Sequence, residues 1–299
     1  MDAWTANGIR YPIAAIVYWP LLYIAFRSGR LNLQLLRRCL VPALFSLFAQ
    51  IFWGLAFYEL QASEVSFLVR LSMLWAIVGS MVLFQDERLL LRRPGFYLGV
   101  ILIVGGFLGM SLINQPTAAD ASATVAAATE SSIEQTDVPL TIETGNYTLG
   151  VIYVLLCGAL FGFYMVSVRS CIPEVDPILA FGVVANFVSI GTITGMFWKG
   201  DVGLLTQQTP FSWSLLIGSS LLGIALGHIM MYIAVQRLGA AITSSCQTLM
   251  PFVTAAAASF ALSESLSRPQ WIAGSVMILG AIVLLSLKHE ISSTRRDHD

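Results

Sequence analysis

The feature that most constrains this chain is a series of long segments that contain no Asp, Glu, Lys or Arg. A helix needs about 20 apolar residues to cross the hydrocarbon core of a bilayer, and each segment reaches or nears that length. Charged residues make up only 11% of the chain, well under the roughly 25% of soluble domains. The chain is therefore predicted to be an all-α polytopic membrane protein. The uncharged segments are residues 39–58, 95–119, 144–168, 177–198, 202–236, 238–263 and 269–287.

Two further spans contain or adjoin a charged residue. An apolar run at 11–26 follows Arg10, and a second run at 65–85 contains Arg70. The segment 202–236 is long enough for one span and a polar loop. Together with the other uncharged segments, these runs give nine predicted transmembrane helices.

Basic residues fall mainly on one side of the predicted membrane. If the loop 27–39 is cytoplasmic, alternation of the spans places twelve of the 16 Lys and Arg residues in the cytoplasm and three outside, namely Arg10, Lys199 and Arg268. Cytoplasmic loops of membrane proteins carry the excess of Lys and Arg. The tail 288–299 is therefore predicted to be cytoplasmic, in a plasma membrane or a bacterial inner membrane.

Residues 114–148 differ in composition from every predicted span. They contain five acidic residues, no basic residue, and many Ala, Ser and Thr, which is typical of a disordered linker. The predicted orientation places this acidic segment outside the membrane. It divides the chain into a first repeat, 1–113, and a second repeat, 149–287, which is followed by the cytoplasmic tail.

A short phrase occurs in both repeats: a glutamate, then a proline, then glycines five and eleven residues after that proline. Proline suits the first turn of a helix, and the glycines would let the helix that follows pack closely on a neighbour. The glutamates favour a helix N-terminus and are interpreted as structural. The two copies are Glu87, Pro94, Gly99 and Gly105, and Glu264, Pro269, Gly274 and Gly280.

The helices before these phrases also correspond. A shift of 177 residues pairs Arg70 with Gln247, whereas the prolines and glycines are shifted by 175. By the count of spans, the loop with Glu87 is cytoplasmic and the loop with Glu264 is external, so the two repeats are inverted. Inverted repeats are the architecture of many secondary transporters, which bind substrate near the membrane midplane between the repeats.

The second repeat resembles the EamA-type domain of the drug/metabolite transporter superfamily. The resemblance is carried by "QTLMPFVTAAAASFALSE" at 247–264 and "SVMILGAIVLLS" at 275–286. In addition, "LGVIYVLLCGALFGFYMVSVR" at 149–169 resembles the opening helix of such a domain. The first repeat is a poorer match, since Leu74 stands where the second repeat has Pro251.

The resemblance implies ten helices in two inverted sets of five, and transport rather than catalysis. It implies that a small organic metabolite, such as an amino-acid-like compound, is exported, and that spans 95–113 and 270–287 pack at the periphery. The chain shows four helices and then five, so a first helix is expected to precede Met1 in the natural reading frame. The spans expected around the pathway are 5–26, 40–60, 65–85, 149–168, 178–197, 213–234 and 242–261.

Motifs of common catalytic and nucleotide sites are absent from the sequence, which has no HExxH, no Walker A loop and no nucleotide-binding glycine loop. We therefore predict no enzyme activity, no cofactor and no metal, and we expect any transport to be secondary-active or facilitative. The net charge of −1 gives no reason to expect a nucleic-acid partner. The expected partners are a small-molecule substrate and the lipid bilayer, and a homodimer is left open.

Polar and aromatic side chains within the spans are the candidates for the substrate cavity. His228 is costly in a span unless it is paired or faces water, and Gln247 shares a helical face with Ser244. Arg70 could hold a substrate carboxylate or phosphate with its fork of donors, or it could snorkel to the outer interface. For Trp53, core packing is the alternative. The predicted cavity residues are Arg70, Gln247, His228, Gln50, Trp53, Tyr232, Asn186 and Ser244.

Two other functions stay open on the sequence. A nucleotide-sugar or sugar-phosphate exchanger would need several basic residues converging in the cavity, where only Arg70 and Arg10 are available. A non-transporting membrane scaffold or sensor would use the acidic segment 114–148 as its contact surface.

Overall fold

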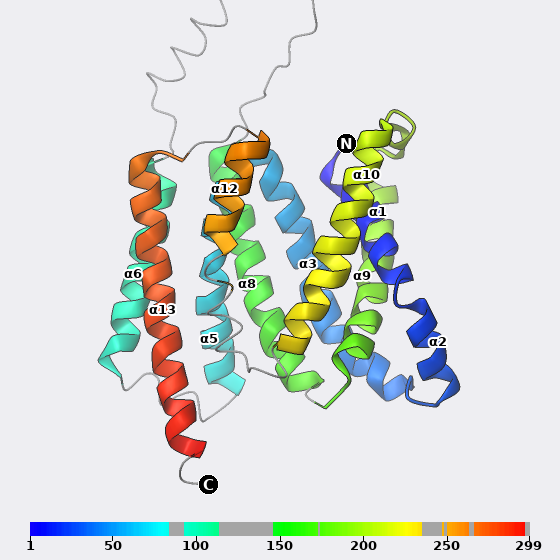
Figure 1. Ribbon diagram of the computed structural model, residues 1–299, viewed down its shortest axis with the longest axis horizontal. Helices are drawn as coiled ribbons and strands as arrows, with labels where there is room; N and C mark the ends of the chain where they lie inside the picture. The colour runs from blue at the N-terminus through cyan, green and yellow to red at the C-terminus, as the bar shows by residue number, and fades with distance from the viewer. Residues whose placement is uncertain are drawn as a thin grey trace, which may run out of the picture.

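Helices are the regular elements throughout the part of the chain that the computed structural model describes. They run roughly side by side in up-and-down order, and the two termini lie at opposite ends of the molecule (Figure 1). The prediction of an all-α chain is confirmed for these residues. The described residues are 1–83, 93–113, 146–172, 174–234, 247, 250–262 and 266–296.

The described residues of the first half of the chain form seven elements. α1 and α2 are separated by a sharp bend, and α4, η1 and α5 together form one long helix with a 3₁₀ turn at its middle. The elements are α1 (Ala3–Ile16), α2 (Trp19–Arg27), α3 (Leu33–Glu59), α4 (Ala62–Leu68), η1 (Val69–Leu71), α5 (Ser72–Leu83) and α6 (Pro94–Ile113).

In the second half, the residues that the structure describes form another seven. η5 is a π-helical stretch that follows α10 without a break, and the helix then continues to Ala234. The elements are α8 (Tyr147–Cys171), α9 (Pro177–Lys199), η4 (Val202–Leu205), α10 (Pro210–Ser219), η5 (Ser220–Leu226), α12 (Met250–Leu262) and α13 (Arg268–Arg296).

Several helices begin at a polar residue whose side chain accepts a hydrogen bond from a backbone N–H of the first turn. These N-terminal N–H groups have no partner within the helix, so a capping side chain stabilises the helix start by about 1 kcal/mol. The capping residues are Asp2, Asn32, Asn146, Asp176 and Thr209, at the starts of α1, α3, α8, α9 and α10.

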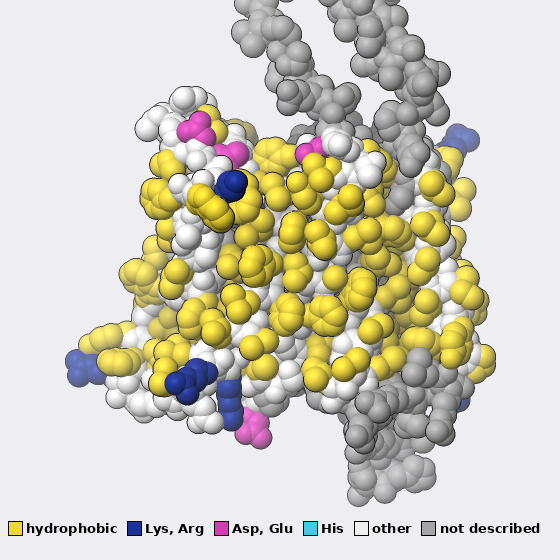
Figure 2. All heavy atoms as spheres, turned by 180° about the vertical axis from the view of Figure 1, so that it is seen from behind, with side chains coloured by type: hydrophobic (Ala, Val, Ile, Leu, Met, Phe, Trp, Pro, Cys, Tyr) yellow, Lys and Arg dark blue, Asp and Glu magenta, His cyan; other side chains and the backbone are white. Residues whose placement is uncertain are grey.

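Within the part of the chain that the structure describes, five helices are long and apolar enough to cross a membrane, and the pair α1 and α2, bent by 49°, makes a sixth if it counts as one span. Three shorter apolar helices lie within α6, α12 and α13. Each of the nine predicted spans overlaps one of these, but the number of crossings stays a prediction. On the face seen in Figure 2, apolar side chains form a broad band, with charged side chains near its two ends. The chain is an integral membrane protein.

Buried side chains form two clusters that share two helices. One cluster gathers α4, α5, α6, α12 and α13 around residues such as Phe67 and Met277. The other gathers α1, α2, α9 and η5 around Tyr11 and Phe181. α3 and α8 contribute to both clusters. In each of these two helices, one half packs in the first cluster and the other half packs in the second. These two helices therefore join the two sides of the bundle.

α6 and α13 lie side by side and run in opposite directions (Figure 1). Their backbones meet at glycines: a Cβ added to Gly99 would lie 3.1 Å from the carbonyl oxygen of Gly280. A Cβ added to Gly280 would lie 2.7 Å from the carbonyl oxygen of Gly99. Only glycine permits so close an approach of two helix backbones.

The contacts between α6 and α13 repeat after exchange of the two helices. Gly280 approaches the backbone of Gly99 and Ile103, and Gly106 approaches the backbone of Ala273 and Met277 in the same way. The two contacts correspond residue by residue at a separation of 174 positions: Gly106 with Gly280, Gly99 with Ala273, and Ile103 with Met277. These matched contacts describe a local two-fold relation between two antiparallel helices.

The same shift of 174 relates contacts on the other side of the bundle. A Cβ on Gly8 in α1 would meet Met196 of α9, and a Cβ on Gly182 in α9 would lie 3.5 Å from Leu22 of α2. Two separate helix pairs therefore follow one repeat register, which supports an inverted repeat at these contacts. The full arrangement of nine helices as inverted repeats stays a prediction.

The register of the glycines differs from the predicted shift of 175. A Cβ on Gly105 would meet nothing within 4 Å, because one residue turns a helix by about 100° and directs Gly105 away from α13. Gly106 makes the close contact instead. Gly274 packs against the ring of Phe67, at 2.7 Å from an added Cβ. Pro94 opens α6 as expected and Pro269 lies at the start of α13, whereas Glu87 and Glu264 lie outside the described residues.

Candidate functional site

Polar side chains from the two halves of the chain meet where α1 packs against α3, α9 and η5. The side-chain amide of Asn7 in α1 donates to the backbone oxygen of Gln50 in α3, at 3.1 Å. Gln50 itself is 8% exposed, so this predicted cavity residue lies inside the bundle and borders the junction.

α1 also carries Arg10 and Tyr11 into this junction. The helix begins at Ala3, so Arg10 lies about 10 Å along it at 1.5 Å per residue. α1 therefore starts earlier than the apolar run 11–26 and continues through Arg10. The expectation that Arg10 lies outside the membrane stays a prediction. The Nε atom of Arg10 and the hydroxyl of Tyr11 are both buried without a hydrogen-bond partner.

The π-helical stretch η5 faces α1 and α2 with freed backbone carbonyls. The hydroxyl of Tyr18 donates to the carbonyl oxygen of Ala225, at 2.7 Å. The Nδ1–H of His228 donates to the carbonyl oxygen of Ile224, at 3.1 Å. A π-turn leaves carbonyls without their usual helical partners, and such turns occur frequently at functional sites. His228 is thus paired within its own helix.

Aromatic rings continue from His228 toward α8 and α9. The ring of His228 stacks on Phe181, with centroids 5.0 Å apart and an interplanar angle of 13°. The hydroxyls of Tyr232 and Tyr164 are hydrogen-bonded at 2.7 Å, and Tyr18 meets Phe181 edge-on at 5.5 Å. The predicted cavity residues His228 and Tyr232 therefore belong to one closed aromatic cluster.

Arg70 lies elsewhere, in the 3₁₀ turn η1 between α4 and α5. Its Nε donates to the carbonyl oxygen of Ser66 in the preceding turn, at 3.4 Å. Its repeat mate Gln247 is helical and half-buried, and no hydrogen bond joins these two described side chains. The expectation that they face one cavity stays a prediction.

A carboxylate lies near Arg70 in the sequence and was missed as a span residue. Glu64 was placed just before the span 65–85, but α4 begins at Ala62 and Glu64 is only 2% exposed. It accepts a hydrogen bond from the side-chain amide of Gln270 in α13, at 3.0 Å. The start of α4 could have been found only by extending the helix across a charged residue.

The remaining predicted residues lie in other settings. Trp53 packs edge-on against Phe57 of its own helix and Phe161 of α8, with centroids 4.9 and 6.2 Å away. Asn186 accepts a hydrogen bond from the exposed Trp19 at 3.0 Å, so it ties α2 to α9 at the edge of the bundle. Ser244 lies outside the described residues.

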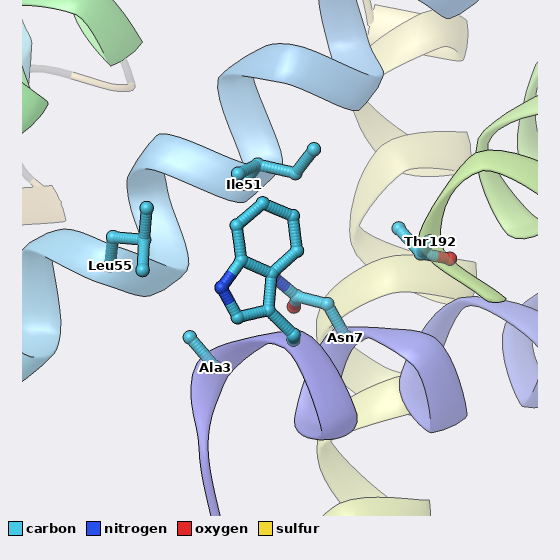
Figure 3. A pocket seen from close by; sticks show the side chains of 6 residues that line it. Ala3, Asn7, Ile51, Leu55 and Thr192 are labelled. Carbon is cyan, nitrogen blue, oxygen red and sulfur yellow. The ribbon is translucent and has the colours of Figure 1, made fainter. Parts of the chain in front are cut away.

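A small pocket lies beside the junction, between α1, α3 and α9. Its labelled lining residues in Figure 3 are Ala3, Asn7, Ile51, Leu55 and Thr192. The cavity volume is about 10 Å³, which is close to the space that one water molecule requires. This pocket therefore has room for about one water molecule and is too small for a metabolite. Among the described residues, no group of three or more His, Cys, Asp and Glu side chains could hold a metal ion.

Comparison with known proteins identifies a family match in the second half of the chain. Residues 148–286 match the EamA-like transporter family. This half is an EamA-type domain. The resemblance stated from the sequence is thereby confirmed for residues 148–286. No curated protein matches the chain.

Solved structures extend the likeness to both halves. One of them, titled "Crystal structure of protein", matches with a TM-score of 0.56 and 14% sequence identity, over 95% of this chain and 87% of that one. At this identity the match shows a shared fold alone. It does show that the first half of the chain, outside the matched family region, takes part in the same fold.

Proposed function

We propose that the EamA-type protein moves a small organic metabolite, amino-acid-like or related, across a plasma or bacterial inner membrane. Transport is secondary-active or facilitative, and its direction is export. The observation that carries this proposal is the polar junction of α1 and α3 with η5, in which Asn7, Gln50, Arg10 and Tyr11 lie inside an otherwise apolar bundle.

The proposed pathway runs between the two repeats. α1 and α3 supply its wall from 1–113, and α8, α9 and η5 supply its wall from 149–287. The hydroxyl pair of Tyr164 and Tyr232 closes the pathway at the end where α8 finishes. Opening this hydrogen bond is one way to connect the junction with the far side of the membrane, as alternating access requires.

The π-turn gives this pathway a place to bend. Its carbonyls at Ile224 and Ala225 accept hydrogen bonds from His228 and Tyr18, so the π-turn is held by side chains as well as by the backbone bonds of the helix. In contrast, α6 and α13 pack on each other at the periphery and form no part of the pathway.

In this proposal the C-terminal tail is cytoplasmic and the segment 114–148 is an external linker.

The experiment compares metabolite profiles of cells that lack or overexpress the protein, followed by efflux of the accumulating compounds from liposomes that contain purified protein. We expect at least one small organic compound to accumulate in cells that lack the protein and to leave the liposomes. A deletion of residues 120–143 should leave this efflux unchanged, since the linker is outside the pathway. Unchanged profiles together with a lost binding partner in the deletion variant would instead favour a scaffold.

A further inference from the structure

The described part of the protein contains two buried side-chain atoms that lack a hydrogen-bond partner, and they belong to consecutive residues. They are the Nε of Arg10 and the hydroxyl oxygen of Tyr11. Buried polar groups are paired in the great majority of cases, because an unpaired donor loses its hydrogen bonds to water without replacement. Two such groups side by side in a membrane span call for a ligand that pairs them.

The surroundings of Tyr11 place its hydroxyl at the centre of the bundle. The residue is 1% exposed and is close to Ser46 of α3 and to Cys157 and Tyr164 of α8. The Ser46 hydroxyl interacts with the Tyr11 hydroxyl, but no hydrogen bond of normal geometry joins the two. The Tyr11 hydroxyl is thus free to donate to a molecule between α1, α3 and α8.

Arg10 faces η5. A Cβ added to Gly223 would lie 4.0 Å from the Nη2 atom of Arg10, and no other atom would come within that distance. The absence of a side chain at Gly223 therefore leaves the guanidinium uncovered on this side. Among the described residues, Tyr11 is the one titratable side chain that interacts with Arg10. Its positive charge has no carboxylate beside it.

We propose that Arg10 and Tyr11 form a carboxylate-binding subsite of the transport pathway, an inference that rests on the proposed function. A guanidinium presents two parallel N–H groups that match the two oxygens of a carboxylate. The Tyr11 hydroxyl supplies a third donor. One guanidinium neutralises one negative charge, so a carboxylate fits better than a phosphate dianion, which would keep a net charge inside the membrane.

This assignment separates the roles of the two arginines within spans. The Nε of Arg70 is already hydrogen-bonded to the carbonyl of Ser66, in its own helix. The Nε of Arg10 has no such partner. The fork that the sequence suggested for Arg70 is therefore assigned to Arg10, which lies at the junction of the two repeats.

The test measures ligand-induced thermal stabilisation of the purified protein, which does not depend on transport. The probes are the proteinogenic amino acids, lactate and benzoate at millimolar concentration, each compared with its amide and with inorganic phosphate. We expect at least one carboxylate to raise the melting temperature by about 2 °C or more, because a ligand that binds the folded state stabilises it. Its amide and phosphate should not.

Three variants assign the effect to the subsite. Arg10→Gln should abolish the carboxylate-specific shift, and Arg10→Lys should weaken it, since lysine keeps the charge and loses the fork. Tyr11→Phe, which removes only the hydroxyl, should reduce the shift. Arg27→Gln is the matched control, because Arg27 is an exposed arginine on α2 paired with Tyr23. It should keep the full shift.

The outcomes separate this inference from the proposed function. An equal shift with acid and amide, a shift retained in Arg10→Gln, or no shift with any carboxylate would overturn the subsite. Efflux from liposomes is then measured with the compound that binds, and Arg10→Gln should slow it at least about tenfold. A carboxylate-specific shift without efflux from the wild type would keep the subsite and overturn transport. Without ligand, Arg10→Gln should melt no lower than the wild type, which shows that it folds.

Discussion

The α6–α13 pair and the junction around α1 use opposite means to hold helices together. At the α6–α13 pair, backbones meet directly at Gly99, Gly106 and Gly280, and no polar side chain takes part in those contacts. At the junction, Asn7 of α1 and Tyr18, which precedes α2, donate hydrogen bonds to backbone oxygens of α3 and η5.

We infer from this difference that the α6–α13 pair is scaffold and that the junction is the region available for function. The glycine contacts have no unpaired group and no space for a ligand. The junction keeps two unpaired donors and a helix with a π-turn, both of which reduce stability unless they serve a purpose. A pathway that must open and close is expected in the second region and not in the first.

The largest expected effect comes from adding one methyl group to the α6–α13 contact. In Gly106→Ala, the new Cβ would lie 2.6 Å from the carbonyl oxygen of Ala273 and the amide nitrogen of Met277. Backbone atoms cannot move aside easily, so we expect a loss of about 3 kcal/mol in the free energy of unfolding. Thermal unfolding in detergent, together with the yield of monodisperse protein, measures this loss.

Gly105→Ala is the matched control, because nothing lies within 4 Å of its added Cβ. Alanine is also the better helix former, so this variant should be neutral or more stable by up to about 1 kcal/mol. Equal destabilisation by the two variants would contradict the contact register described above.

The next effect concerns the link between the peripheral helices and the rest of the bundle. Gln270→Leu removes the donor to the buried Glu64 and the acceptor for the backbone N–H of Ser267. We expect a loss of about 2 kcal/mol, because a buried carboxylate loses a partner. Chemical or thermal unfolding measures it. Gln208→Leu, which loses only a bond to the carbonyl of Leu204 in its own turn, should cost far less. A larger loss of stability in Gln208→Leu than in Gln270→Leu would show that the bond between Gln270 and Glu64 does not stabilise the bundle.

A smaller effect is expected where α2 begins and meets the π-turn. Tyr18→Phe removes the hydrogen bond to the carbonyl oxygen of Ala225 while the ring stays in contact with Phe181. We expect a loss of about 1 kcal/mol, and faster hydrogen exchange in η5 than in α6. Tyr97→Phe on α6, where the ring is exposed, serves as control and should change neither quantity. Unchanged exchange in the Tyr18 variant would show that the hydroxyl does not hold the turn.

The smallest expected effect on stability is at the start of α1, where Asp2 is the capping residue. Partial burial would raise the pKa of Asp2, but hydrogen bonds from the side chain and backbone of Thr5 and from the backbone of Asp201 outweigh this and lower it. Because the pKa is lowered on folding, the charged form of Asp2 stabilises the fold at pH values above its ordinary pKa of 3.8. This stabilisation is lost as the pH falls through the lowered pKa. Asp2→Asn should therefore melt slightly lower at neutral pH and equally at strongly acidic pH. A difference that persists in acid would have another cause.

The sequence predicted the scaffold better than the site. Repeated proline and glycine marked α6 and α13 because close helix packing requires small residues at fixed spacing, although Gly106 rather than Gly105 makes the contact. An error of one position is expected when two copies are aligned across loops of different length, since the phrase does not show which glycine faces the partner.

The site was harder to predict for two physical reasons. Arg10 was placed before its span because a charged residue reads as a helix boundary, whereas α1 continues through it. The π-turn at Ser220–Leu226 leaves no mark in the apolar pattern, so the pairing of His228 and Tyr18 with its carbonyls was not visible. His228 and Gln50 were singled out as cavity candidates because polar side chains in a span are costly and thus stand out, and their role in a cavity stays a prediction.

The central claim is that the junction of α1 and η5 faces a water-filled pathway, while the outer face of α6 meets lipid. The direct measurement is the rate at which a membrane-impermeant, water-soluble thiol reagent labels a single cysteine in otherwise cysteine-free protein in membranes. Gly223→Cys, opposite Arg10, should be labelled, and Gly105→Cys, an exposed position on α6, should react at least about tenfold more slowly, since thiols react as the thiolate. Equal labelling of the two positions, or labelling of Gly105→Cys alone, would contradict the account.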